Sequence, residues 1–142
     1  MTSPVTELID LLSLERLEVN LFRGQSRDIG TKYVFGGQVL GQALSAAQAT
    51  LAEARTAHSL HAYFLKAGDI AAPVVYQVDR TRDGGSFSVR RVTAIQHGQV
   101  IFFCAAFVLL ERRGAEKITW PCWIAVTRRT EKLPPSRVRS TW

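Results

Sequence analysis

The chain has 142 residues, of which 46% are hydrophobic, so it can bury one sizeable core and is shorter than most two-domain proteins. Its formal net charge of +6 is unevenly placed, because residues 1–110 carry ten basic and nine acidic side chains whereas residues 111–142 carry eight and three. The body is therefore nearly neutral, and its charge does not mark it as a nucleic-acid-binding domain.

The first predicted elements are a helix and a strand. Apolar residues at helical spacing predict a short amphipathic helix from Thr6 to about Leu14, capped near Thr6 or Ser3, and a first strand is expected around Leu17 to Arg23. The N-terminal residues 1–7 have no basic segment ahead of their apolar residues and do not resemble a secretory signal. We therefore expect a cytoplasmic protein.

The segment Val34–Leu44 carries the most informative local pattern. Gly36 and Gly37 precede an apolar helix, rich in small residues, that extends to about Leu51. Glycine lets the backbone approach a ligand closely, and the free N–H groups of a first helical turn attract an oxyanion or a phosphate. The pattern fits a ligand-facing helix N-terminus, and ordinary turn chemistry is the alternative. Such a helix needs burial on most sides, which a curved antiparallel sheet can supply.

The second half of the chain is rich in β-branched and aromatic residues. Four strands are predicted between turn signals, at residues 58–65, 74–81, 87–95 and 100–110. Short glycine-containing connections make successive strands antiparallel neighbours. The apolar run that forms the last strand is too short to span a bilayer, so no membrane-spanning segment is expected. One helix followed by a run of strands is an α+β arrangement.

Several spaced segments, in the correct order, resemble the acyl-CoA thioesterase II family. They are Phe22–Ser26, Val34–Leu44, His58–Leu65 with Gly68-Asp69, and Arg82–Gly84 with Ser86–Ser88 and Arg90-Arg91. The match runs from about Leu8 to about Leu109. The resemblance implies a hotdog fold, in which an antiparallel sheet wraps around one central helix, and hydrolysis of fatty acyl-CoA to a free fatty acid and coenzyme A.

The resemblance covers only the first of the two hotdog domains that members of this family contain. The family's catalytic Asp, Ser or Thr, and Gln lie in the second domain, so no catalytic residue is assigned in this chain. The residues expected to bind substrate are Gly36, Gly37, Gln38 and His58. Because hotdog domains pair edge to edge, we expect either a homo-oligomer or pairing with a second hotdog domain.

Among side chains with acid–base chemistry, His58 and His61 come first, because histidine can act as a general base near neutral pH. In a regular strand they point to opposite faces, so no metal site is predicted, and no cofactor is expected. A hydrogen-bonded structural role is the alternative for His58. Asp83 can orient a base, although an Asp-Gly pair ordinarily forms a turn. Cys104 lies in an apolar run and is expected to be a core residue.

For the other polar side chains, both a functional and a structural role are compatible with the sequence. Gln38 and Gln42 lie one helical turn apart and can present amides to a thioester or a water, or make structural hydrogen bonds. Arg90 and Arg91 alternate faces, so at least one should be exposed, either as a contact for a coenzyme A phosphate or as a solvated arginine. No Gly-x-Ser-x-Gly motif is present, so a serine-hydrolase mechanism is unsupported.

The composition changes at about Leu110. We assign residues 1–110 to a hotdog domain and residues 111–142 to a divergent, disordered basic tail. A truncated or out-of-frame end of the chain would also explain the change in composition. The tail holds all three tryptophans, and arginines mixed with tryptophans can bind nucleic acid, but the spacing follows no known nucleic-acid-binding module. The alternative function for the whole chain is a non-catalytic hotdog module that binds acyl-CoA or a partner protein.

Overall fold

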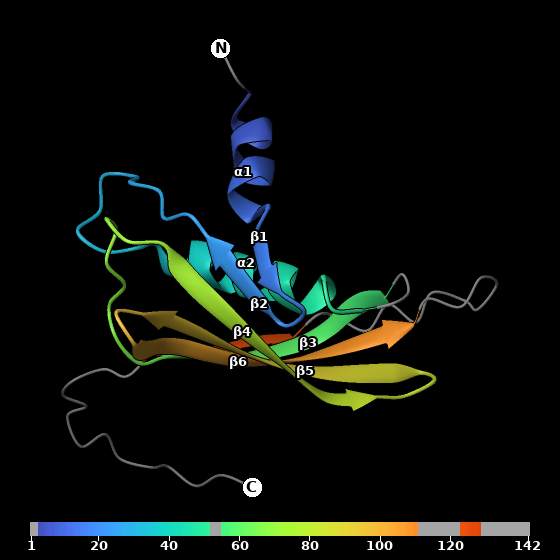
Figure 1. Ribbon diagram of the computed structural model, residues 1–142. Helices are drawn as coiled ribbons and strands as arrows, with labels where there is room; N and C mark the ends of the chain where they lie inside the picture. The colour runs from blue at the N-terminus through green and yellow to red at the C-terminus, as the bar shows by residue number, and fades with distance from the viewer. Residues whose placement is uncertain (1–2, 52–54, 111–122, 129–142) are drawn as a thin grey trace, which may run out of the picture.

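The computed structural model describes residues 3–51, 55–110 and 123–128 (Figure 1). Within these ranges the chain forms two helices and seven strands, in the order α1 (Pro4–Leu12), β1 (Glu15–Glu18), β2 (Leu21–Gly24), α2 (Gly36–Gln48), β3 (Arg55–Phe64), β4 (Val74–Asp83), β5 (Phe87–Gln96), β6 (Gln99–Leu110) and β7 (Trp123–Arg128). No helix in this described part of the chain is long and apolar enough to cross a lipid bilayer.

The strands form one sheet in the order β1-β2-β4-β5-β6-β3-β7. Neighbouring strands are antiparallel except β3 and β7, which are parallel. Figure 1 shows α2 lying across one face of this sheet, while α1 stands away from it near the N-terminus. The arrangement confirms the α+β prediction, and β3 to β6 match the four predicted strands to within three residues at each end.

The predicted single strand around Leu17 to Arg23 is wrong. The structure divides this segment into the antiparallel strands β1 and β2. Between them, the Asn20 carbonyl accepts a hydrogen bond from the Val78 N–H at 2.8 Å, and the Asn20 side-chain oxygen accepts one from Arg80 Nε at 2.9 Å. The turn is therefore held by residues of β4. These residues are distant in sequence, so the local pattern of apolar residues does not predict the turn.

The strand β7 was not predicted. It lies in the segment that the sequence assigned to a disordered tail, and it pairs with β3 from Ser59 opposite Trp123 to Phe64 opposite Arg128. A parallel pair joins segments that are far apart in the chain, so the composition of the tail alone does not reveal it. The rest of the predicted tail, residues 111–122 and 129–142, lies outside the described residues.

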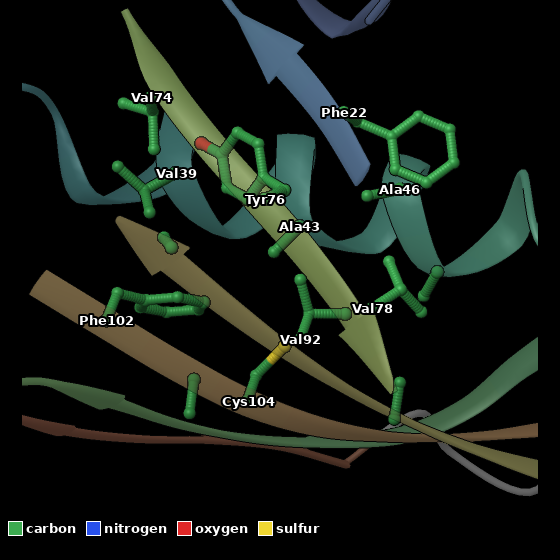
Figure 2. Packing of buried hydrophobic residues seen from close by; sticks show 14 of the residues in the cluster. Phe22, Val39, Ala43, Ala46, Val74, Tyr76, Val78, Val92, Phe102 and Cys104 are labelled. Carbon is green, nitrogen blue, oxygen red and sulfur yellow. The ribbon is translucent and has the colours of Figure 1, made fainter. Parts of the chain in front are cut away.

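Small side chains bring α2 close to the sheet. Ala43, Ala46 and Ala47 are fully buried on this helix. Figure 2 shows helix and strand side chains meeting in one apolar layer, among them Val39, Ala43, Tyr76, Val92, Phe102 and Cys104. The prediction that Cys104 is a core residue is confirmed, and burial raises the pKa of its thiol to about 12. Cys104 is therefore protonated at neutral pH and is a poor nucleophile.

Candidate functional site

A cavity of about 630 Å³ opens where the N-terminus of α2 meets the end of β3 and the start of β6. Most of its lining is apolar, and the lining residues are Tyr33, Val34, Gly36, Val39, Phe64, Leu65, Lys66, Ala67, Gly68, Ile101 and Phe102. Its volume lies within the usual range for small-molecule sites. The cavity is large enough for a flexible apolar ligand, and Gly36, the first residue of α2, is part of its lining.

Backbone contacts hold two walls of this cavity together. The Val34 N–H donates to the Gly68 carbonyl at 3.0 Å. A Cβ atom added at Gly68 would lie 3.1 Å from the Cβ and Cγ2 atoms of Val34, so the two chain segments touch closely there. The Gln96 side chain holds the loop that follows Gly68. Its Oε1 accepts a hydrogen bond from the Asp69 N–H at 2.8 Å, and its Nε2 donates to the carbonyls of Asp69 and Ala72 at 2.9 Å each.

The helix N-terminus at the cavity has no side-chain cap. Phe35 is the N-cap residue and supplies no side-chain hydrogen bond, while its carbonyl accepts from the N–H groups of Gln38 and Val39. The N–H groups of Gly36 and Gly37 come earlier, in the first turn, where a helix offers no intrahelical acceptor. Together with the helix dipole, these two groups favour an oxygen that carries negative charge.

The family model for the acyl-CoA thioesterase N-terminal domain matches residues 23–110 of the sequence. This range includes α2, β3 to β6 and every cavity residue. The chain belongs to this family. It is 54% identical over 96 residues to acyl-coenzyme A thioesterase 8 of Homo sapiens, covering 68% of this chain and 30% of that protein. It is 45% identical over 116 residues to acyl-CoA thioesterase 2 of Haemophilus influenzae, covering 82% and 41%.

Solved structures agree with this family assignment. The tesB protein of Mycobacterium avium subsp. paratuberculosis aligns with a TM-score of 0.73 at 33% identity, over 81% of this chain and 46% of that one. The predicted hotdog fold is confirmed. The chain spans less than half the length of these relatives, and the matched part is the N-terminal domain of the family.

Of the four residues predicted to bind substrate, the structure brings Gly36 to the cavity. Gly37 follows it in the same turn, and a Cβ atom there would lie 2.5 Å from Cε1 of Phe35. His58 is half-buried at a bulge in β3, between Ala57 and Ser59, where the register with β6 shifts. His58 is six residues from Phe64, or roughly 20 Å along the strand, so it does not line the cavity.

Gln38 and its neighbour Gln42 use their amides for structural hydrogen bonds. Gln38 is 5% exposed, its Nε2 donates to the Gln25 carbonyl at 3.0 Å, and its Oε1 accepts from the Arg27 N–H at 3.3 Å. Gln42 is fully buried, and its Nε2 donates to the same Gln25 carbonyl at 3.0 Å. These contacts join α2 to the segment after β2, and neither side chain lines the cavity. Substrate binding by Gln38 stays a prediction.

Gly24 makes the packing of Gln42 possible. A Cβ atom at Gly24 would lie 2.5 Å from Gln42 Oε1 and 2.9 Å from its Nε2. The same amide donates to the Leu11 carbonyl at 2.7 Å and accepts from the Tyr76 hydroxyl at 2.7 Å. The segments Phe22–Ser26 and Val34–Leu44, which the sequence resemblance singled out separately, are therefore parts of one contact.

The two neighbouring arginines of β5 have different environments. Arg91 is exposed and lies 5.5 Å from the centre of the Phe103 ring. The prediction that at least one of the two is exposed is confirmed by Arg91, whereas Arg90 is 1% exposed. Its guanidinium donates to Thr50 Oγ1 at 2.8 Å, to the Arg82 carbonyl at 3.0 Å and to the Asp83 carboxylate, where it forms an ion pair. These contacts are structural, and Arg90 does not line the cavity.

The Arg90–Asp83 pair predicts a dependence of stability on acidic pH. The hydrogen bond from Arg90 is the main reason that the pKa of Asp83 lies below its ordinary value of 3.8. A lowered folded-state pKa stabilises the fold above the unfolded-state value, and this contribution is lost as the pH falls through the folded-state value. In urea unfolding, we expect Asp83→Asn to destabilise the chain at about pH 6 and to have little effect near pH 2. An effect of equal size at both pH values would contradict this account.

The sequence did not single out Lys66, Tyr33 or Phe64 as cavity residues. Lys66 is the second residue after β3 and is the charged residue of the lining, whereas Tyr33 precedes the glycine segment. Tyr33 lies directly before the segment Val34–Leu44, Phe64 lies within the segment His58–Leu65, and Lys66 lies directly after it, so these recognised segments could have indicated them. No cluster of three or more His, Cys, Asp or Glu side chains with the geometry of a metal site occurs among the described residues.

Proposed function

We propose that this chain is the first hotdog domain of an acyl-CoA thioesterase and that its cavity holds the acyl-thioester part of the substrate. The observation that carries the proposal is the position of the cavity, which has an apolar lining and the first turn of α2 at its end. The curated relatives named as acyl-CoA thioesterases support the same substrate class.

In this proposal the acyl chain packs against Val39, Phe64 and Phe102, and the thioester carbonyl lies at the N–H groups of Gly36 and Gly37. Hydrolysis adds water to the carbonyl carbon, breaks the carbon–sulfur bond and releases coenzyme A as the thiol. Negative charge develops on the carbonyl oxygen during attack, and the two N–H groups and the helix dipole would stabilise it.

The described cavity lining has no carboxylate or imidazole to activate the water as a base. The lining contains no Asp, Glu, His, Cys or Ser. We therefore infer that a second hotdog domain completes the catalytic site. The alternative function, a hotdog module that binds acyl-CoA without hydrolysing it, is favoured by the same absence of a base. A cytoplasmic location stays a prediction.

The first test measures binding and thiol release with the purified 142-residue chain, and its mass in solution is recorded on the same sample. We expect the chain to bind a long-chain acyl-CoA and, as a monomer, to release no thiol. Failure of the folded chain to bind acyl-CoA would overturn the proposed function. Thiol release by a monomer would show that the base lies within this chain, contrary to the inferred need for a second domain.

Gly37→Val should weaken acyl-CoA binding by roughly tenfold or more. A side chain at this position displaces the Phe35 ring, since the added Cβ would lie 2.5 Å from Cε1, and it narrows access to the first-turn N–H groups. Phe35 is 53% exposed, so its ring can move and the fold should persist. Gly85→Val is the matched control, because a Cβ atom there meets nothing within 4 Å. Unchanged binding by Gly37→Val would count against the placement of the thioester.

A further inference from the structure

Lys66 is held at the cavity by contacts on both its backbone and its side chain. The N–H groups of Leu65 and Lys66 both donate to the Ile101 carbonyl, at 2.9 and 3.1 Å. This forked contact fixes the end of β3 against the start of β6. At the other end of the side chain, Nζ donates a hydrogen bond to Oε1 of Gln99. Lys66 thus lines the cavity and is exposed, and its ammonium group is held by Gln99, which lies outside the lining.

The charge of Lys66 is not neutralised by a described carboxylate. Gln99 is a neutral partner, and none of the salt bridges among the described residues includes Lys66. The carboxylate that follows it in the chain, Asp69, lies 2.9 Å from His97 Nε2 and accepts from the Ala71 N–H at 2.9 Å. A cation at an otherwise apolar cavity, without a negative partner, is suited to an anionic group on the ligand.

A second cation and an aromatic ring lie on the Tyr33 side of the same cavity. Tyr33 is 50% exposed, and Lys32 Nζ lies 5.4 Å from the centre of its ring. The cavity is therefore lined by apolar residues together with two exposed residues, Lys66 and Tyr33, and Lys32 lies beside Tyr33 outside the lining. This distribution matches a ligand with an apolar end and an anionic end, which is the chemistry of a thioester of a nucleotide-bearing thiol.

We propose that Lys66 binds a phosphate of the coenzyme A part of the substrate and so determines that the site takes nucleotide-bearing thioesters. The proposal rests on the proposed function, because it requires the acyl-thioester to lie in this cavity. Gln99 is the positioning residue for the ammonium group. The interaction is a charge-assisted hydrogen bond from an exposed cation, so it contributes to affinity more than to folding.

The test compares two ligands with the same acyl chain, an acyl-CoA and an S-acyl-pantetheine that has no phosphate. Lys66→Met should weaken binding of the acyl-CoA by roughly tenfold and change binding of the acyl-pantetheine less than about twofold. It should also reduce the dependence of acyl-CoA binding on salt. Lys66→Arg should retain most of the affinity, because it keeps the charge. Arg80→Met, which removes one exposed positive charge outside the cavity lining, should bind both ligands as the wild type does.

Each outcome separates this proposal from the proposed function. If the wild type binds neither ligand, the proposed function fails and this proposal falls with it. If the wild type binds and Lys66→Met weakens both ligands equally, Lys66 is part of the cavity wall and the phosphate contact is refuted. If Lys66→Met changes neither ligand, Lys66 is an ordinary solvated lysine. Thermal unfolding of each variant verifies that it is folded.

Discussion

Replacing Gln42 with leucine is expected to lower the free energy of unfolding by about 2–4 kcal/mol. The Gln42 side chain is fully buried and makes three hydrogen bonds, to the Leu11 carbonyl, the Gln25 carbonyl and the Tyr76 hydroxyl. Leucine has a similar size and removes all three. The Tyr76 hydroxyl is then left without its acceptor inside the protein, which costs more than the hydrogen bond itself contributes.

The measurement is equilibrium urea unfolding of the wild type and the variant, with Gln48→Leu as the control. Gln48 lies on the same helix but is exposed, so the identical substitution should change stability by less than about 0.5 kcal/mol there. In a double-mutant cycle with Tyr76→Phe, the Gln42–Tyr76 pair should show a coupling of about 1 kcal/mol. Equal effects at the two glutamines would mean that the buried hydrogen bonds contribute little.

Leu65→Trp is expected to weaken binding of a long-chain acyl-CoA by roughly tenfold or more and to affect a short-chain acyl-CoA far less. Leu65 lines the cavity and is 41% exposed, so a larger side chain can occupy the cavity without disturbing the core. The indole ring would take up part of the 630 Å³ that we assign to the acyl chain. A long acyl chain needs more of this space than a short one.

Leu17→Trp is the matched control for this substitution. Leu17 is also 41% exposed, but it lies on β1 and does not line the cavity. Both variants should unfold at temperatures close to that of the wild type, and the Leu17 variant should bind both ligands normally. An equal loss for long and short chains in the Leu65 variant would show that the acyl chain does not extend along this wall.

Local sequence patterns located most of the elements correctly. The strands β3 to β6 and the helix α2 follow from alternating or helically spaced apolar residues, and glycines mark the turns between them. The pattern failed at β1 and β2, where contacts from Asn20 to β4 divide one apolar segment into two strands. It also failed at β7, whose partner β3 is distant in the chain.

The candidate site was predictable only in part, because some of its residues are placed by partners that are distant in the chain. Gly36 could be named because the need for glycine before a helix is a local property. It lines the cavity, and its role in substrate binding stays a prediction. Residue type alone could not decide whether Gln38 faces a ligand or the Gln25 carbonyl, or whether Arg90 faces solvent or Thr50. Those choices depend on which distant residues supply acceptors.

The sequence by itself determined the α+β arrangement, the family and the position of the glycine segment before α2, because the periodicity of apolar residues and the order of the motifs along the chain indicate each of them. Tertiary structure alone decided that Lys66, Tyr33 and Phe64 share a cavity with Gly36, that Gln42 fills the space beside Gly24, and that β7 pairs with β3. The physical reason is that cavities, buried hydrogen bonds and strand pairs form between side chains and backbones that are distant in sequence, whereas periodicity records only which face of an element is apolar.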